Sequence, residues 1–372
     1  MPGDSMSPLE HVLDKARWAP SGDNVQTWRF EKIADDAFIV HAFDTRDTVV
    51  YDFDGRPSQI ALGALLENIS LAATEQGMQA EISRIGEPEI AGNSEAVAYS
   101  VKLLREAGCV PHPLAAMIEK RSVQRRALSV FDISEQHRTL LEQAVGDDFS
   151  VKWFSGWQEK CRIAGLLWQN ARIRLTMPEA FPVHKKVIDW GKQFSPDRIP
   201  DQAIGMDKLG LLLMRWAMHS WQRVNFMNRY MAGTWLPRIQ LDLVPALFCG
   251  AHFMIVARKK PGTTEDFIAA GHALQRFWLT ATQLGIQLQP EMTPLIFNWY
   301  VNAGRSCSKA AHIWPAMQGL QTKLVQLVGG ASLRNGCFMG RIGYGKPASA
   351  RSLRLPVQDL QFAPDTKKTE GA

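Results

Sequence analysis

The sequence predicts an α+β fold in which two similar halves are joined in one chain, and three observations lead to this fold class. Residues 60–79 and 268–287 match without gaps at a shift of 208 positions. Segments rich in β-branched and aromatic residues lie before and after each of these repeated segments, as expected of strands. The 372 residues are 46% hydrophobic, so the chain can bury more than one core.

The repeat itself predicts two equivalent helices. Both copies carry apolar or small residues at helical spacing, lack an internal proline and end in glycine. Composition alone could make two amphipathic helices look alike, but it explains less well the matched early glycine and the Ala-Thr pair. A duplicated chain is a dimer fused into one polypeptide, whose two-fold interface becomes internal. The recurring residues are Ile60, Ala61, Gly63, Leu66, Leu71, Ala73, Thr74, Gly77 and Gln79, matched by Ile268, Ala269, Gly271, Leu274, Leu279, Ala281, Thr282, Gly285 and Gln287.

The elements of each half follow from these patterns. In the first half, residues 1–108, we expect helices over 8–18 and 58–77 and strands over 27–33, 37–43, 79–84 and 97–104. In the second half, residues 109–363, we expect helices over 112–120, 134–145, 263–285 and 315–328 and strands over 149–154, 251–259 and 337–345, with a further strand in IQLQPEM. Residues 364–372 look disordered.

A long helical stretch in the second half has no counterpart in the first half. We assign residues 155–236 to a helical insertion. Residues 153–236 hold seven of the twelve tryptophans and many methionine and basic residues. Three interpretations stay open: an extra core layer, a helical cover (lid) over a ligand pocket, or an amphipathic surface that touches a membrane.

Composition excludes several classes of protein. The net charge of +5 suits an anionic small ligand and is too mild for a nucleic-acid binder. No apolar run is long enough for a membrane span, and the N-terminus lacks the apolar core of an export signal. Five scattered cysteines without C-x-x-C, and no Cys/His cluster, argue against a structural metal. We therefore expect a cytoplasmic protein without a metal site.

Three polar motifs could carry chemistry. The turn Ala19-Pro20-Ser21-Gly22-Asp23-Asn24 follows the first helix and could converge on a flat polar ligand, or it could be an ordinary turn. In Arg121-Ser122-Val123-Gln124-Arg125, a helix would place both arginines on one face, where they suit a phosphate; a solvated basic run is the alternative. Arg351 and Arg354, before Leu355-Pro356, could complete an anion site or be plain surface charge.

A fourth motif is misleading. Residues 340–346 match the spacing of a phosphate-binding loop, G-x-x-x-x-G-K. Pro347 stands where a hydroxyl residue should bind magnesium, and no helix is indicated after it. We interpret this segment as a strand with its turn.

These residues resemble the nitroreductase family of FMN-dependent α+β flavoproteins. The N-terminal turn is similar to that family's A-P-S-x-x-N-x-Q-P-W motif, with Thr27 in place of Pro. The repeated helix resembles its long central helix. The basic segment resembles R-x-[ST]-x-R, with Val123 at the hydroxyl position and Ser122 beside it, and the RLP segment resembles its C-terminal phosphate-binding arm. The fused, lid-covered branch that includes the mycobacterial Acg proteins is the most similar in arrangement.

The resemblance implies a nitroreductase-like fold with an internal pseudo-dimer, a helical lid and one FMN site per chain. Pro20, Ser21 and Asn24 would contact the isoalloxazine ring, and Arg121, Arg125 and Arg354, with Ser122 adjacent, would hold the phosphate. The implied activity is that of an oxidoreductase that takes a hydride from NADH or NADPH and reduces a small-molecule acceptor. The alternative is a protein that sequesters FMN under its lid, and a flavin-free scaffold is a third interpretation. A fused dimer has less need to dimerise again, so we expect a monomer, and no catalytic side chain is indicated.

Overall fold

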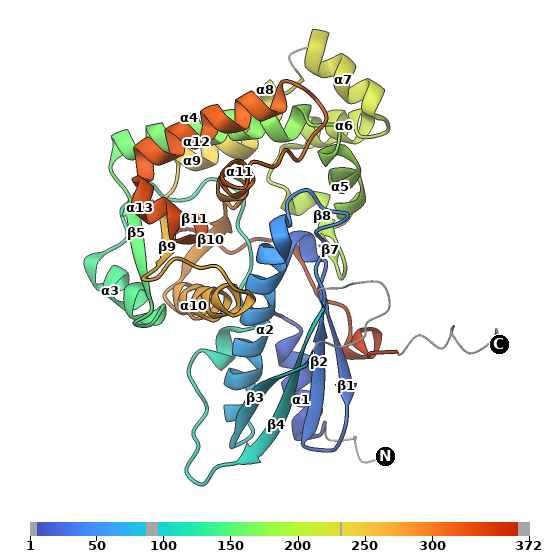
Figure 1. The fold of residues 1–372 in the computed structure, drawn as a ribbon, viewed down its shortest axis with the longest axis vertical. Helices are drawn as coiled ribbons and strands as arrows, with labels where there is room; N and C mark the ends of the chain where they lie inside the picture. The colour runs from blue at the N-terminus through green and yellow to red at the C-terminus, as the bar shows by residue number, and fades with distance from the viewer. Residues whose placement is uncertain (1–5, 87–95, 231–232, 364–372) are drawn as a thin grey trace, which may run out of the picture.

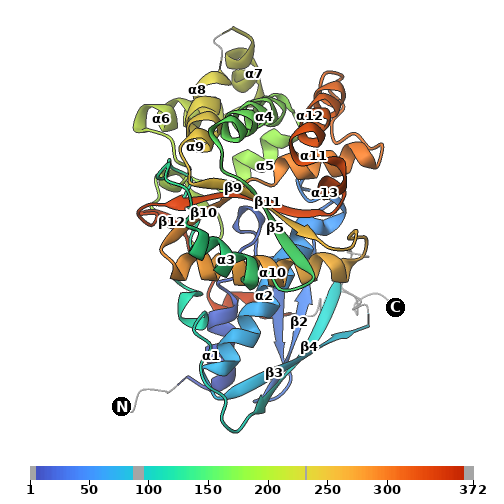
Figure 2. The same cartoon turned by 90° about the vertical axis from the view of Figure 1, so that its left-hand side faces the viewer.

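The computed structural model describes residues 6–86, 96–230 and 233–363. Two four-stranded antiparallel sheets are each backed by a long helix, and a group of further helices covers the far side of the second sheet (Figures 1 and 2). The tail expected to be disordered, residues 364–372, lies outside the described residues.

The first sheet is built from the N-terminal third of the chain. Its spatial order is β1-β2-β4-β3, and all neighbours are antiparallel. Helix α1 begins with a capping box between Ser7 and Glu10 and packs on α2. The elements are α1 (Pro8–Ala16), β1 (Trp28–Lys32), β2 (Ala37–Ala42), α2 (Arg56–Thr74), β3 (Met78–Ile85) and β4 (Val97–Arg105).

The second sheet has the same connectivity. Its spatial order, β5-β9-β11-β10, repeats the order of the first sheet when strands are matched by their position along the chain. Its neighbours are also antiparallel, and α3 packs on α10 as α1 packs on α2. The elements are α3 (Glu135–Ala144), β5 (Phe149–Phe154), β9 (Ala251–Ala257), α10 (Thr264–Gln283), β10 (Ile286–Pro290) and β11 (Gly336–Tyr344).

The two repeated helices, α2 and α10, cross at their matched glycines. A Cβ atom on Gly63 would lie 1.9 Å from the carbonyl oxygen of Ile268, and one on Gly271 would lie 2.1 Å from that of Ile60. Only a residue without a side chain allows the two backbones to come this close. The two contacts are equivalent, because Gly63 matches Gly271 and Ile60 matches Ile268 in the repeat.

Two hydrogen-bonded polar pairs beside the crossing are related by the repeat in the same way. Glu67 accepts a hydrogen bond from Arg276 at 3.0 Å, and Gln275 donates one to Asn68 at 2.7 Å. The shift of 208 positions converts one pair into the other. Contacts in which i meets j′ and j meets i′ also occur where two identical subunits pack about a two-fold axis.

The remaining helices lie outside the two sheet units. Helices α4, α11 and α12 pack together over the second sheet, and α5 to α8 lie at the end of the molecule away from the first sheet (Figures 1 and 2). Among the described residues, none of the helices is both long and apolar enough to cross a membrane. The helices are α4 (Trp157–Thr176), α5 (Ala180–Val187), α6 (Lys208–Ala217), α7 (Trp221–Tyr230), α8 (Trp235–Pro237), a π-helical turn (Arg238–Leu243), α9 (Val244–Leu247), α11 (Thr293–Asn302), α12 (Ile313–Val328) and α13 (Gly330–Arg334).

The C-terminal arm returns to the first unit. Its strand β12 (Arg351–Ser352) pairs in parallel with β7 (Phe194–Ser195) of the insertion, where β6 (Ile188–Asp189) also pairs with β8 (Ile199–Pro200). Beyond β12, Leu360 is fully buried in the core of the first unit. The arm therefore brings residues near position 354 beside the N-terminal turn.

One expected helix is wrong. Residues 112–120 contain only a 3₁₀ turn, Ala115–Met117. Pro111 and Pro113 remove backbone donors at the start of this segment, and the few residues that follow cannot sustain a helix. The segment 340–346 lies mostly in β11, as the strand interpretation requires.

Candidate functional site

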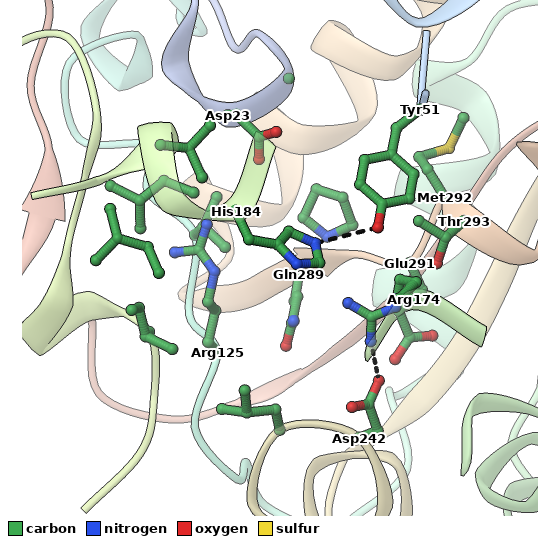
Figure 3. A pocket seen from close by; sticks show the side chains of 18 of the residues that line it. Asp23, Tyr51, Arg125, Arg174, His184, Asp242, Gln289, Glu291, Met292 and Thr293 are labelled. Carbon is green, nitrogen blue, oxygen red and sulfur yellow. Dashed lines mark hydrogen bonds and ion pairs between the residues drawn. The ribbon is translucent and has the colours of Figure 1, made fainter. Parts of the chain in front are cut away.

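A cavity of about 700 Å³ lies where the N-terminal turn, α10, the C-terminal arm and the insertion meet (Figure 3). Its size falls within the usual range for small-molecule sites, about 300–1,000 Å³. Six residues indicated by the sequence line it, namely Pro20, Ser21, Asn24, Arg121, Arg125 and Arg354. Ser122 is half-buried and is not among the lining residues.

The N-terminal turn is held in a strained conformation. Asp23, Asn24 and Gln26 have φ angles of +50°, +64° and +54°, a region that costs a residue with a side chain about 1–2 kcal/mol. The side chain of Gln26 fixes the turn, because it donates to the carbonyl oxygens of Asn24 and Pro196 and accepts from the backbone N–H of Leu355. Such strain concentrates at functional sites, where the surrounding structure overrides it.

Three arginines from two distant segments lie together, and two of them, Arg121 and Arg354, line the cavity. Arg121 is 2% exposed, donates to the carbonyl oxygen of Trp18 at 2.9 Å and lies over the ring of Trp278. Arg354 donates to the carbonyl oxygen of Ala19 at 2.9 Å, and Arg351 donates to that of Arg121. In the described part of the chain, no ion pair joins a carboxylate to any of the three.

The energetics of this cluster favour an anion. Burial lowers the pKa of Arg121 well below its usual value, and the like charges of Arg354 and Arg351 lower it further. Burial, reinforced by Arg351 and Arg17, lowers the pKa of Arg354 to about 9. Buried cations that repel one another are costly unless a negative group balances them. We call Arg121, Arg351 and Arg354 the arginine cluster.

Arg121 and Arg125 share a face for a different reason from the one expected. The segment around them is extended, and Val123 forms a parallel bridge with Leu288 of β10, so the helical expectation is wrong. In an extended chain alternate residues point the same way, and Arg121, Val123 and Arg125 all line the cavity. Ser122 lies between two of them, which explains why it does not line the cavity.

Arg125 lies close enough to a carboxylate for the two charges to affect each other. Asp23 also lines the cavity (Figure 3), and its charge partly offsets the burial that lowers the pKa of Arg125. Burial raises the pKa of Asp23 despite the opposing effect of Arg125. The wall formed by Asp23 and Arg125 is therefore less positive than the arginine cluster.

A second polar group lies elsewhere in the cavity. Arg174 of α4 donates to Asp242 of the π-helical turn at 2.6 Å, and Tyr51 bonds His184 of α5 at 3.1 Å (Figure 3). Burial raises the pKa of Asp242 to about 6, although Arg174 opposes the shift. Burial, reinforced by Arg174, lowers the pKa of His184 to about 4, so this histidine is neutral at pH 7.

Sequence reasoning missed these four residues. Each is a single polar residue in a different segment, and no spacing connects them. Their proximity arises because the insertion folds back over the loop before α2. A π-helical turn often occurs at a functional site, but its irregular hydrogen bonding leaves no mark in the sequence.

Comparisons with known proteins give limited results. No protein-family model and no curated protein sequence matches the chain. Among solved structures, a nitroreductase-like family protein from Bacillus cereus matches with 11% identity and a TM-score of 0.34, covering 68% of this chain and 97% of that one. The FMN-dependent nitroreductase NfnB from Mycobacterium smegmatis, solved in complex with NADPH, matches with 13% identity and a TM-score of 0.36, covering 66% and 96%. Both TM-scores are below 0.5.

Proposed function

We propose that this protein is an FMN-dependent oxidoreductase of the nitroreductase type. The observation that carries the proposal is the arginine cluster, which has no acidic ion-pair partner in the described chain and lies at the same cavity as the strained N-terminal turn. The ribityl phosphate of FMN carries up to two negative charges and needs several charge-assisted hydrogen bonds, which guanidinium groups supply well.

The rest of the cavity fits a flat, mostly apolar ring. Apolar walls come from Ile60 and Ala61 of α2 and from Leu274 and Trp278 of α10. Pro20, Ser21 and Asn24 supply polar atoms and backbone at one edge. When bound, FMN supplies the redox chemistry, since its ring accepts a hydride from NADH or NADPH and passes electrons to a second substrate.

The helix crossing supports the duplication proposal. We infer that residues 1–108 and 109–363 are two nitroreductase-like halves forming an internal pseudo-dimer, because the sheets share one connectivity and the α2–α10 contacts are reciprocal. The cavity takes its turn from the first half and Arg121, Arg125 and Arg354 from the second. This combination occurs once in the chain, so we infer one FMN site per chain. A fused dimer has less need to dimerise again, so we also infer a monomer.

The insertion, residues 155–236, acts in this proposal as a lid. Its helices contribute Asn170, Arg174, Leu213 and Met227 to the cavity wall, so it shields the ligand from water. Reduction of an acceptor requires a proton as well as a hydride. The Asp242 carboxyl, with its pKa raised to about 6, can hold a proton inside the cavity below about pH 6.

The same lid supports a second candidate function. If the insertion does not open, a nicotinamide cannot reach the flavin, and the protein stores FMN without turnover. Rapid anaerobic mixing of the purified protein with NADPH, and separately with NADH, distinguishes the two. We expect the visible flavin absorbance to bleach within seconds with at least one donor. A yellow protein that neither donor bleaches contradicts the oxidoreductase and supports storage.

A further inference from the structure

The outer surface of helices α6, α7 and α8 is unusually apolar. On α6, Leu209, Leu212 and Trp216 are 66%, 65% and 48% exposed, and they follow one helical face. On α7 and α8, Tyr230 and Trp235 are 66% and 57% exposed. These helices lie together at the end of the molecule farthest from the first sheet (Figures 1 and 2). We call this region the α6–α8 surface, formed by Leu209, Leu212, Leu213, Trp216, Phe226, Tyr230, Trp235 and Ile239.

The inner faces of the same helices are apolar too. Met214 and Ala217 of α6 and Val224 and Met227 of α7 line the cavity. A helix that is hydrophobic on both faces is normally buried on both, yet α6 is covered only on its inner side. Leu213 lines the cavity and is also 42% exposed, so the apolar wall is continuous with the outer surface.

The charges on this surface are mainly positive. Residues 207–239 contain five lysine or arginine side chains, of which Arg238 is buried, and one acidic residue, Asp207, which is exposed and caps α6 by accepting from the backbone N–H of Gly210. Lys208, Arg215 and Arg229 are exposed, and Arg223 lies over the ring of Trp216, which holds α7 against α6. Leucine and aromatic residues bordered by lysine and arginine are typical of helices that lie in the interface of an anionic bilayer.

A second copy of this chain fits the α6–α8 surface less well than an anionic bilayer does. A two-fold contact through this surface would place Arg215 and Arg229 of one copy near the same cations of the other. The acidic residue that precedes this segment, Asp207, already accepts hydrogen bonds from Gly210 and Gln240, so it is a poor partner for these cations. Like charges brought together at an interface are repulsive.

We propose that the α6–α8 surface docks the protein peripherally on an anionic lipid bilayer. On the bilayer, the apolar outer side of α6 would be buried among lipid tails. The basic side chains would favour a negatively charged lipid surface.

Vesicle cosedimentation of the full chain tests the docking. We expect binding to phosphatidylglycerol–phosphatidylcholine vesicles at least tenfold stronger than to phosphatidylcholine alone, and weaker in high salt. Leu212→Glu should reduce binding at least tenfold, because Leu212 is exposed and does not line the cavity. Phe131→Glu is the matched control, since Phe131 is 77% exposed and lies outside the α6–α8 surface. It should bind as the unchanged protein does.

Three results would overturn the docking: no vesicle binding, equal binding by the Leu212→Glu variant, or a dimer in sedimentation velocity that Leu212→Glu dissociates. A protein that is purified without flavin but binds vesicles contradicts only the proposed function. A protein that contains flavin but does not bind vesicles contradicts only the docking.

Discussion

Gly63→Ala should destabilise the protein by about 3 kcal/mol, which is at the upper end for overpacking, and could prevent folding. The added methyl group would lie 1.9 Å from the carbonyl oxygen of Ile268 and 2.9 Å from the Cα of Gly271. Both obstacles are backbone atoms, so no side-chain rotation relieves the clash, and α2 must move away from α10. Gly271→Ala should have a similar effect, because its Cβ would lie 2.1 Å from the carbonyl oxygen of Ile60.

The matched control for these variants is Gly319→Ala. Gly319 lies within α12, and a Cβ atom there would meet nothing within 4 Å. Replacing an exposed helical glycine with alanine should stabilise the protein by about 0.5–1 kcal/mol. Urea unfolding followed by circular dichroism measures all three variants. A Gly63→Ala protein as stable as Gly319→Ala would show that the two helices do not cross at these glycines.

Arg121→Ala and Arg354→Ala should each weaken FMN binding roughly 10- to 100-fold, since a hydrogen bond to a charged group contributes about 1.5–3 kcal/mol. The double variant should be purified without flavin. The measurement is the dissociation constant from quenching of FMN fluorescence, with thermal unfolding to verify that the fold persists.

Arg126→Ala is the control for the arginine variants. Arg126 belongs to the same basic segment, but it is exposed and does not line the cavity. Its replacement should leave FMN affinity within about twofold, because surface charges contribute little. If Arg126→Ala weakens binding as much as Arg121→Ala does, general positive charge rather than the arginine cluster holds the phosphate.

The fold could be predicted where short-range patterns and the repeat agreed. The matched glycines, Gly63 and Gly271, supported the repeat in the sequence, but only the structure reveals that the two helices cross at them. The strands of both sheets were expected close to their observed limits, since each carries β-branched or aromatic residues next to clear turns. The short strands β6, β7, β8 and β12, of two residues each, could not be predicted, because pairing between distant segments creates them.

The candidate site was predictable in part. Arg121, Arg125 and Arg354 could be selected because permanent charge suits an anion, yet the shared face of Arg121 and Arg125 follows from an extended segment rather than a helix. The second polar group could not be found, since Tyr51 and His184 meet only when the insertion folds over the cavity. Residues joined by tertiary contacts alone leave no periodic pattern in the sequence.

The amount of FMN bound per chain tests the proposed site most directly. The protein is purified without added flavin, saturated with FMN and desalted; it is then denatured, and the released cofactor is identified by mass and quantified against the chain. We expect one FMN per chain, because the N-terminal turn and the arginine cluster each occur once. No retained FMN, or two per chain, would contradict a single site formed between the two halves.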